Sequence, residues 1–289
     1  MLASLQRRVD ETVRAIQASP TLDRIGRSVA TAFSNVARPG ALKDLLSGTW
    51  LGHPAHPMLT DVPIGAWTSA FFLDLMGGDA AGDAADALVG MGVLAALPTA
   101  VTGLSDLTDV VTREDRSLGV AHAVGNLGAV TLYALSFVQR RRGRRGSGKA
   151  LALAGAAVVT GGAYLGGHLV YRRVVGPSHA ALERPVEDWT PVLGEADLVE
   201  GEPTRVNVRG TDIMVVRSKD GIHALANRCS HRSGPLHKGE VTEDRVTCPW
   251  HLSSFRLADG SVIRGPATAP QPAFDVRIRD QQIEVRSRR

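Results

Sequence analysis

The sequence predicts a multidomain protein in which an all-α bundle of four transmembrane helices precedes an all-β domain. Four long apolar stretches within residues 50–175 predict the bundle. Beyond Trp189 the apolar positions recur with a period of two, which is typical of strands. A chain of 289 residues is long enough for about two domains of ordinary size.

Residues 1–49 predict amphipathic N-terminal helices. Apolar side chains recur with helical spacing in two runs, first Leu2, Leu5, Val9, Val13 and Ile16, then Leu22, Ile25, Val29, Phe33 and Val36. Pro20 separates the runs. We expect these helices to pack on the rest of the protein or to lie at a lipid surface. A signal peptide needs an uninterrupted apolar core, and the charged and polar side chains within residues 6–11 interrupt it, so we expect no cleavage.

The four apolar stretches cover residues 59–75, 84–104, 119–138 and 150–170. Each has about the 17–25 residues that a helix needs to cross a bilayer. Their glycine and alanine content permits close helix packing in lipid. The sequence therefore predicts a four-helix membrane domain over residues 50–175. A water-soluble bundle is the alternative, because alanine-rich helices also pack in water.

Four histidines lie near helix ends that share one membrane face. Consecutive spans run in opposite directions, so the starts of the first and third spans and the end of the fourth meet on one side. His53 and His56 stand at the first of these places, His122 at the second and His168 at the third. Each is an interfacial polar residue on the simplest interpretation, but helix bundles also build cofactor sites from facing side chains. Two of His56, His122 and His168 are candidate axial ligands of haem b, with a non-haem metal or a quinone pocket as alternatives.

Both cysteines of the chain stand beside histidines, within residues 227–255. Cys229 and His231 form a C-x-H pair, and Cys248 and His251 form a C-x-x-H pair. Two thiolates and two imidazoles can bind zinc, or a [2Fe–2S] cluster in which histidines replace two cysteines on one iron. Zinc fingers usually take cysteines from one loop and histidines from another, whereas each loop here supplies one of each. This arrangement favours the dinuclear centre.

The surrounding residues give these pairs the forms C-x-H-x-x-G-P-L and C-P-W-H-x-S-x-F. Both forms resemble the Rieske iron–sulfur family. The resemblance implies that Cys229 and Cys248 bind one iron and that His231 and His251 bind the other. We assign the Rieske domain to residues 189–289, after a linker over residues 176–188, and its short antiparallel strands and turns predict a β-sandwich or barrel.

Residues next to the ligands set the expected redox potential. The resemblance places Gly234, Ser253 and Pro266 around the cluster, with Ser253 where high-potential members have a serine that hydrogen-bonds it. Phe255 stands where those members have a tyrosine, and Leu252 where glycine is common. Fewer hydrogen-bond donors imply the ferredoxin or oxygenase type, near the low end of the roughly −150 to +300 mV Rieske range.

A second motif, H-P-x-H-P-M, covers residues 53–58 at the start of the first span. Together with residues 166–171, GGHLVY, it resembles a family of uncharacterised bacterial four-helix membrane proteins, some of which are fused to a Rieske module. This resemblance implies architecture and localisation and no chemistry.

Six strands are expected in the β domain, over residues 204–208, 212–216, 222–226, 245–247, 274–278 and 283–285. Turns such as Lys219-Asp220-Gly221 separate them. The two ligand pairs then lie on loops that project from one end of the domain.

The sequence therefore predicts a membrane-anchored electron-transfer protein rather than a complete enzyme. The alternatives are a ferredoxin component of an oxygenase or reductase system with the helices as a simple anchor, and a membrane redox sensor. We expect a redox protein or a quinone as partner, together with membrane lipid. The net charge of +4 comes largely from arginine clusters beside apolar spans, which indicate topology or anionic lipid and not nucleic acid. We expect a multi-pass protein of the bacterial inner membrane with its Rieske domain in the cytoplasm.

Overall fold

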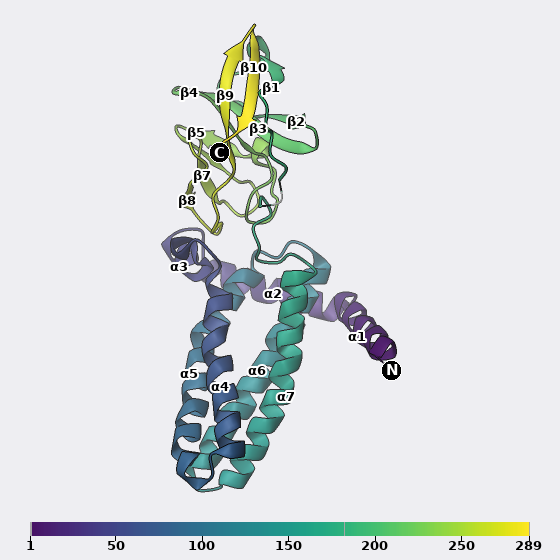
Figure 1. The fold of residues 1–289 in the computed structure, drawn as a ribbon, viewed down its shortest axis with the longest axis vertical. Helices are drawn as coiled ribbons and strands as arrows, with labels where there is room; N and C mark the ends of the chain where they lie inside the picture. The colour runs from purple at the N-terminus through teal and green to yellow at the C-terminus, as the bar shows by residue number, and fades with distance from the viewer. Residues whose placement is uncertain (1, 182, 289) are drawn as a thin grey trace. The chain divides into compact units, whose positions relative to one another are not determined.

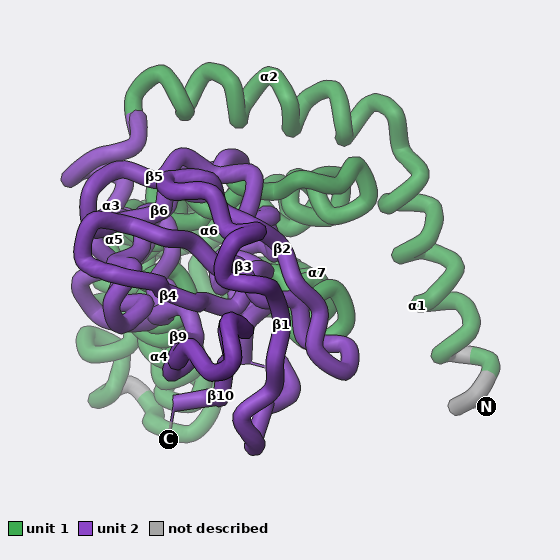
Figure 2. The backbone as a smooth tube through the Cα atoms, turned by 90° about the horizontal axis from the view of Figure 1, so that it is seen from above, with its two compact units in different colours: residues 1–36, 55–175 green, residues 37–54, 176–289 purple. Residues whose placement is uncertain are grey.

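The computed structural model describes residues 2–181 and 183–288, which form two compact units (Figure 2). The first unit contains residues 1–36 and 55–175, and the second contains residues 37–54 and 176–289. The short segment Ala37–Pro54 therefore belongs with the C-terminal unit, although the sequence places most of it with the N-terminal helices.

The first unit is helical (Figure 1). Its helices are α1 (Leu2–Gln17), α2 (Pro20–Val36), α4 (Ala55–Met76), α5 (Gly82–Leu107), α6 (Arg113–Arg141) and α7 (Arg145–Tyr171). The predicted break at Pro20 is confirmed, since a proline needs no N–H donor in the first turn of a helix. Helices α4–α5 and α6–α7 form two hairpins, and Trp67, Val89 and Tyr133 lie in the core between them.

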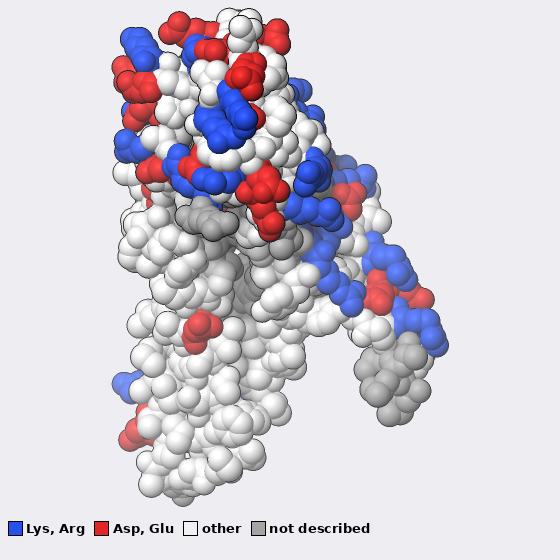
Figure 3. Space-filling model, turned by 45° about the horizontal axis from the view of Figure 1, so that its top comes forward, with Lys and Arg blue, Asp and Glu red and all other residues white. Residues whose placement is uncertain are grey.

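The prediction of four membrane spans needs a correction. In the part of the chain that the structure describes, three helices are long and apolar enough to cross a bilayer, namely α5, α6 and α7. Helix α4 is long enough, but polar residues and prolines occupy its first turns, including His56, Asp61 and Pro63. The face of the bundle visible in Figure 3 is largely free of charged side chains.

The second unit contains α3 (Ala41–Ser47), η1 (Thr49–Leu51) and two antiparallel sheets. The larger sheet has the order β1 (Thr190–Gly194), β10 (Gln282–Ser287), β9 (Ala273–Arg279), β4 (Gly221–Ala226), β3 (Thr211–Ser218) and β2 (Thr204–Val208). The smaller has the order β5 (Glu240–Thr242), β6 (Arg245–Thr247), β7 (Ser254–Arg256) and β8 (Val262–Arg264). The expected all-β domain is confirmed.

All six predicted strands are present, while β1, β5, β7 and β8 were not predicted. Three of the four missed strands, β5, β7 and β8, have only three residues, which is too short to show a clear alternation. One apolar core joins the two sheets through Met214, Leu225 and Phe255, and it includes both cysteines.

Candidate metal centre

The two cysteine loops have the same backbone design. In each loop the cysteine N–H donates to the carbonyl five residues later, from Cys229 to Gly234 at 2.9 Å and from Cys248 to Ser253 at 2.8 Å. In each loop the cysteine carbonyl accepts from the residue four positions later, Ser233 or Leu252. These last two residues have positive φ angles of 58° and 62°. The left-handed backbone explains why glycine suits the Leu252 position.

The loops bring their side chains together from different parts of the chain. The first loop follows β4 and the second lies between β6 and β7. Both cysteines are buried, and their side chains lie close enough for each to shift the pKa of the other. The rings of His231 and His251 lie 5.0 Å apart between centroids and at 87° to each other. A Cβ at Gly234 would lie 2.6 Å from Sγ of Cys248, so glycine leaves the space that this sulfur needs.

The loop backbones direct N–H groups at both cysteine sulfurs. The hydrogen bond from Cys229, opposed by burial, lowers the pKa of Cys248 to about 7, and N–H groups of Trp250 and His251 also lower it. The same bond and burial raise the pKa of Cys229, against N–H groups of His231 and Arg232. N–H groups directed at a sulfur stabilise its negative charge, which metal binding requires.

A third loop, residues 265–267, completes the surroundings. Its members are buried, and the N–H of Ala267 donates to Oγ of Ser253 at 2.9 Å. Oδ1 of Asp44 accepts from the N–H of Gly265 at 2.9 Å, and Oγ1 of Thr49 donates to the carbonyl of Ala267 at 3.2 Å. Pro266 therefore lies in a loop that the segment ahead of the helical bundle fixes. Sequence reasoning missed Asp44 and Thr49.

Gln271 is a second residue that sequence reasoning missed. Its side chain is 1% exposed. Its Oε1 accepts from the N–H of Ser230 at 2.9 Å, and its Nε2 donates to the carbonyls of Ala226 and Arg228 at 2.6 Å each. Gln271 thereby holds both sides of the first cysteine loop. A glutamine flanked by prolines, as at residues 270–272, is the only signal that the sequence offers for it.

The structure brings together two of the four candidate histidines of the bundle. The rings of His56 and His122 lie 6.3 Å apart. His168 instead lies 6.4 Å from the ring of Tyr164, and His53 is exposed in the second unit, with its Nδ1 3.2 Å from the carbonyl of Pro54. Of the four histidines that were predicted to lie together, only His56 and His122 form a pair in the described structure.

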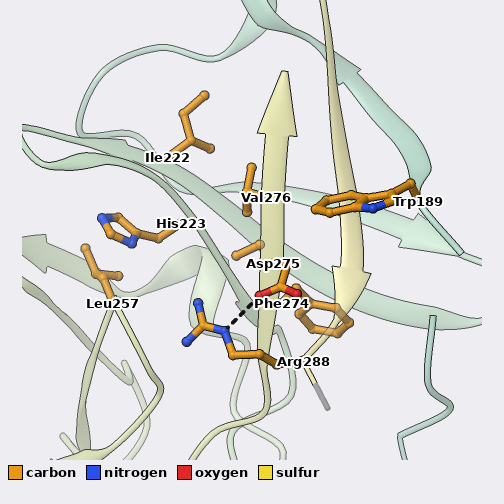
Figure 4. A pocket seen from close by; sticks show the side chains of 9 residues that line it. Trp189, Ile222, His223, Leu257, Phe274, Asp275, Val276 and Arg288 are labelled. Carbon is orange, nitrogen blue, oxygen red and sulfur yellow. Dashed lines mark hydrogen bonds and ion pairs between the residues drawn. The ribbon is translucent and has the colours of Figure 1, made fainter. Parts of the chain in front are cut away.

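A separate hollow lies on the large sheet (Figure 4). Trp189, His223 and Phe274 contribute to its lining, and Arg288 forms an ion pair across it with Asp275 at 3.2 Å. Neither cysteine loop contributes to its lining, so the hollow is distinct from the candidate metal centre.

Comparisons with known proteins match the helical part and the β part of the chain to two different families. Residues 188–275 match the family "Rieske [2Fe-2S] domain", and residues 52–179 match the family "Predicted membrane protein (DUF2231)". The link between the H-P-x-H-P-M motif and the second family stays a prediction.

Several curated relatives match the β domain. The ferredoxin subunit of anthranilate 1,2-dioxygenase from Burkholderia cepacia is 30% identical over 103 residues, which are 36% of this chain and 95% of the relative. Ferredoxin CarAc from Metapseudomonas resinovorans is 29% identical over 34% of this chain and 92% of the relative. Human apoptosis-inducing factor 3 is 31% identical, but the chain spans only 15% of its length.

Among solved structures, the ferredoxin of carbazole 1,9a-dioxygenase from Nocardioides aromaticivorans IC177 is 30% identical. The match covers 35% of this chain and 100% of that one, with a TM-score of 0.34. The paired cysteine and histidine loops, the two family matches and the curated ferredoxin subunit lead to one conclusion, that the chain belongs to the Rieske [2Fe–2S] family and joins a Rieske domain to a domain of a predicted membrane protein family.

Proposed function

We propose that this protein is a membrane-anchored one-electron carrier. Cys229 and Cys248 bind one iron of a [2Fe–2S] cluster as thiolates, and His231 and His251 bind the other through imidazole nitrogen. When bound, the cluster supplies reversible one-electron chemistry. The observation that carries this proposal is the pair of matching loops, which bring the two cysteine side chains together and place the rings of His231 and His251 5.0 Å apart.

The chain's own residues determine where electrons leave and at what potential. Both cysteines are 1% exposed, whereas both histidines are partly exposed and form the route to a partner. Trp250 and Leu252 flank His251 and are 48% and 42% exposed, which supports a docking surface for a redox protein there. Phe255 offers no hydroxyl donor, so we keep the expectation of a low potential.

We place the helical unit in the bacterial inner membrane as a multi-pass anchor, with the Rieske domain in the cytoplasm. Large apolar side chains cover the outside of the bundle, including Leu94 at 68% exposure and Leu127 at 67%. Such surfaces suit contact with lipid rather than water. One relative is the ferredoxin subunit of anthranilate 1,2-dioxygenase, which favours an oxygenase or reductase as partner. A quinone is the second candidate acceptor.

The proposed function is tested by anaerobic titration of the detergent-purified full chain with dithionite. We expect the cluster to take up one electron and to return it to an oxidant, over repeated cycles, as followed by the EPR signal of the reduced cluster. Reoxidation by decylubiquinone would identify quinone as acceptor. Uptake of no electron, or bleaching that does not reverse, would refute an electron carrier.

The contact from Asp44 predicts an effect on how firmly the cluster is held. In Asp44→Ala the buried N–H of Gly265 loses its acceptor, which costs about 1–3 kcal/mol. We expect the variant to release iron to a chelator several-fold faster than the wild type, measured from the visible absorbance. Asp188→Ala, which removes an exposed carboxylate of the same unit, is the control. Equal release rates in the two variants would show that Asp44 does not support the site.

A further inference from the structure

The two helical hairpins of the first unit repeat one arrangement of side chains. His56 and Trp67 on α4 have His122 and Tyr133 as counterparts on α6, at the same separation along the chain. The rings of Trp67 and Tyr133 stack at 4.0 Å between centroids and 5° between planes. The Trp67–Tyr133 pair and the His56–His122 pair thus each join equivalent positions of the two hairpins.

The second helices of the hairpins repeat as well. Gly92 and Gly103 on α5 correspond in spacing to Gly155 and Gly166 on α7. A Cβ at Gly92 would collide with the ring of Trp67, and one at Gly155 would lie 3.0 Å from the ring of Tyr133. The glycines therefore make room for the aromatic pair in the same way in both hairpins. We infer that α4–α5 and α6–α7 are parallel repeats related by a pseudo-two-fold axis along the bundle.

The two histidines are held in equivalent ways. Nδ1 of His56 lies 2.9 Å from the carbonyl of Thr99, and Nδ1 of His122 lies 2.8 Å from the carbonyl of Gly162. These carbonyls occupy equivalent positions on α5 and α7. Four residues further on, a Cβ at Gly103 would lie 2.8 Å from Cε1 of His56, and one at Gly166 would lie 2.9 Å from Cε1 of His122.

This geometry leaves the other ring nitrogen for a ligand. A carbonyl that accepts from Nδ1–H fixes the tautomer whose Nε2 binds metals. Nδ2 of Asn126 lies 3.1 Å from Nε2 and 3.3 Å from Nδ1 of His122. An amide almost equidistant from both nitrogens does not lie along the Nε2 lone pair, so it does not occupy the coordination direction.

We propose that His56 and His122 are the two axial ligands of a haem held between the hairpins. Two imidazoles on opposite sides of one metal, with each nitrogen about 2 Å from it, have ring centroids roughly 6 Å apart. The observed separation is 6.3 Å, with the rings at 85° to each other. A bare Zn²⁺ usually takes four protein ligands, whereas a haem supplies the other four nitrogens itself and needs two axial ligands.

The proposal does not depend on the iron–sulfur cluster and is tested separately from it. We would express the full chain with a haem precursor in the medium, purify it in detergent and measure haem as the pyridine complex. We expect about one haem per chain, which His56→Ala and His122→Ala each lose while the EPR signal of the cluster stays. His168→Ala and His53→Ala should retain the haem.

Two further measurements make the result decisive if the alanine variants fold poorly. His56→Met replaces one class of axial ligand by another, so it should keep haem and shift its reduced absorption bands. The proposal is overturned by a wild-type chain that lacks haem but holds its cluster, by haem loss in His168→Ala alone, or by copper or zinc at one atom per chain without porphyrin.

Discussion

Cys248→Ala is expected to lose the [2Fe–2S] cluster completely. The thiolate is one of two that bind the same iron, and the remaining sulfur of Cys229 cannot hold that iron alone. Cys229→Ala should have the same effect. His231→Ala and His251→Ala should also abolish the cluster, because each removes one of two imidazoles from the other iron. Iron and sulfide content together with visible absorbance measure the loss.

A control variant separates loss of ligand from loss of fold. His223 lies on β4 with its Nε2 3.1 Å from Oγ of Ser218, so it belongs to the same domain but not to the centre. His223→Ala should keep two irons and two sulfides per chain. Normal cluster content in any of the four ligand variants would refute that ligand.

Arg140→Ala is expected to destabilise the helical unit by about 3–5 kcal/mol, the usual effect of removing one partner from a buried ion pair. The Arg140 side chain is fully buried between α4 and α5. It pairs with Asp74 and, at 3.0 Å, with Asp86, while its Nε donates to Oγ of Ser136 at 3.1 Å. Alanine removes one cation from each carboxylate, both 12% exposed, and leaves Asp86 with Arg145 at 2.9 Å and Asp74 with Lys149 at 3.6 Å. The expected readout is a lower midpoint of thermal unfolding in detergent.

Arg172→Ala is the matched control for this effect. Arg172 pairs with Asp10 at 3.1 Å, but its side chain is 55% exposed. Exposed pairs contribute roughly 0–1 kcal/mol, so the unfolding midpoint should change little. The unfolding midpoint of Arg140→Lys should lie between those of Arg140→Ala and Arg172→Ala, because an ammonium group cannot form the two parallel hydrogen bonds of a guanidinium. Equal shifts in Arg140→Ala and Arg172→Ala would contradict the structural role of the buried pair.

The sequence predicted the fold class because its signals are local. Apolar runs of about twenty residues locate α5, α6 and α7, and alternation locates strands such as β10, in which Ile283 and Val285 alternate with polar residues. The first turns of α4 misled the count of spans, since His56, Asp61 and Pro63 interrupt the apolar surface there. Length alone does not make a span when polar groups lie within it.

Residue types at fixed spacings were enough to predict the candidate metal centre. The residues that hold its third loop in place, Asp44 and Thr49, could not be predicted in this way. Asp44 and Thr49 precede Gly265 by more than 200 positions, and nothing in a single sequence indicates contacts at that separation. The repeat of the hairpins was also missed. The two hairpins have different residues at most equivalent positions, such as Trp67 and Tyr133, so they resemble each other in geometry more than in sequence.

One measurement tests the central claim most directly, namely EPR of the dithionite-reduced, detergent-purified full chain, with iron and sulfide determined on the same sample. A cluster held by Cys229, His231, Cys248 and His251 predicts two irons and two sulfides per chain and a Rieske-type signal from the reduced state. One zinc per chain in place of iron, or the signal of a cluster bound by four cysteines, would contradict it.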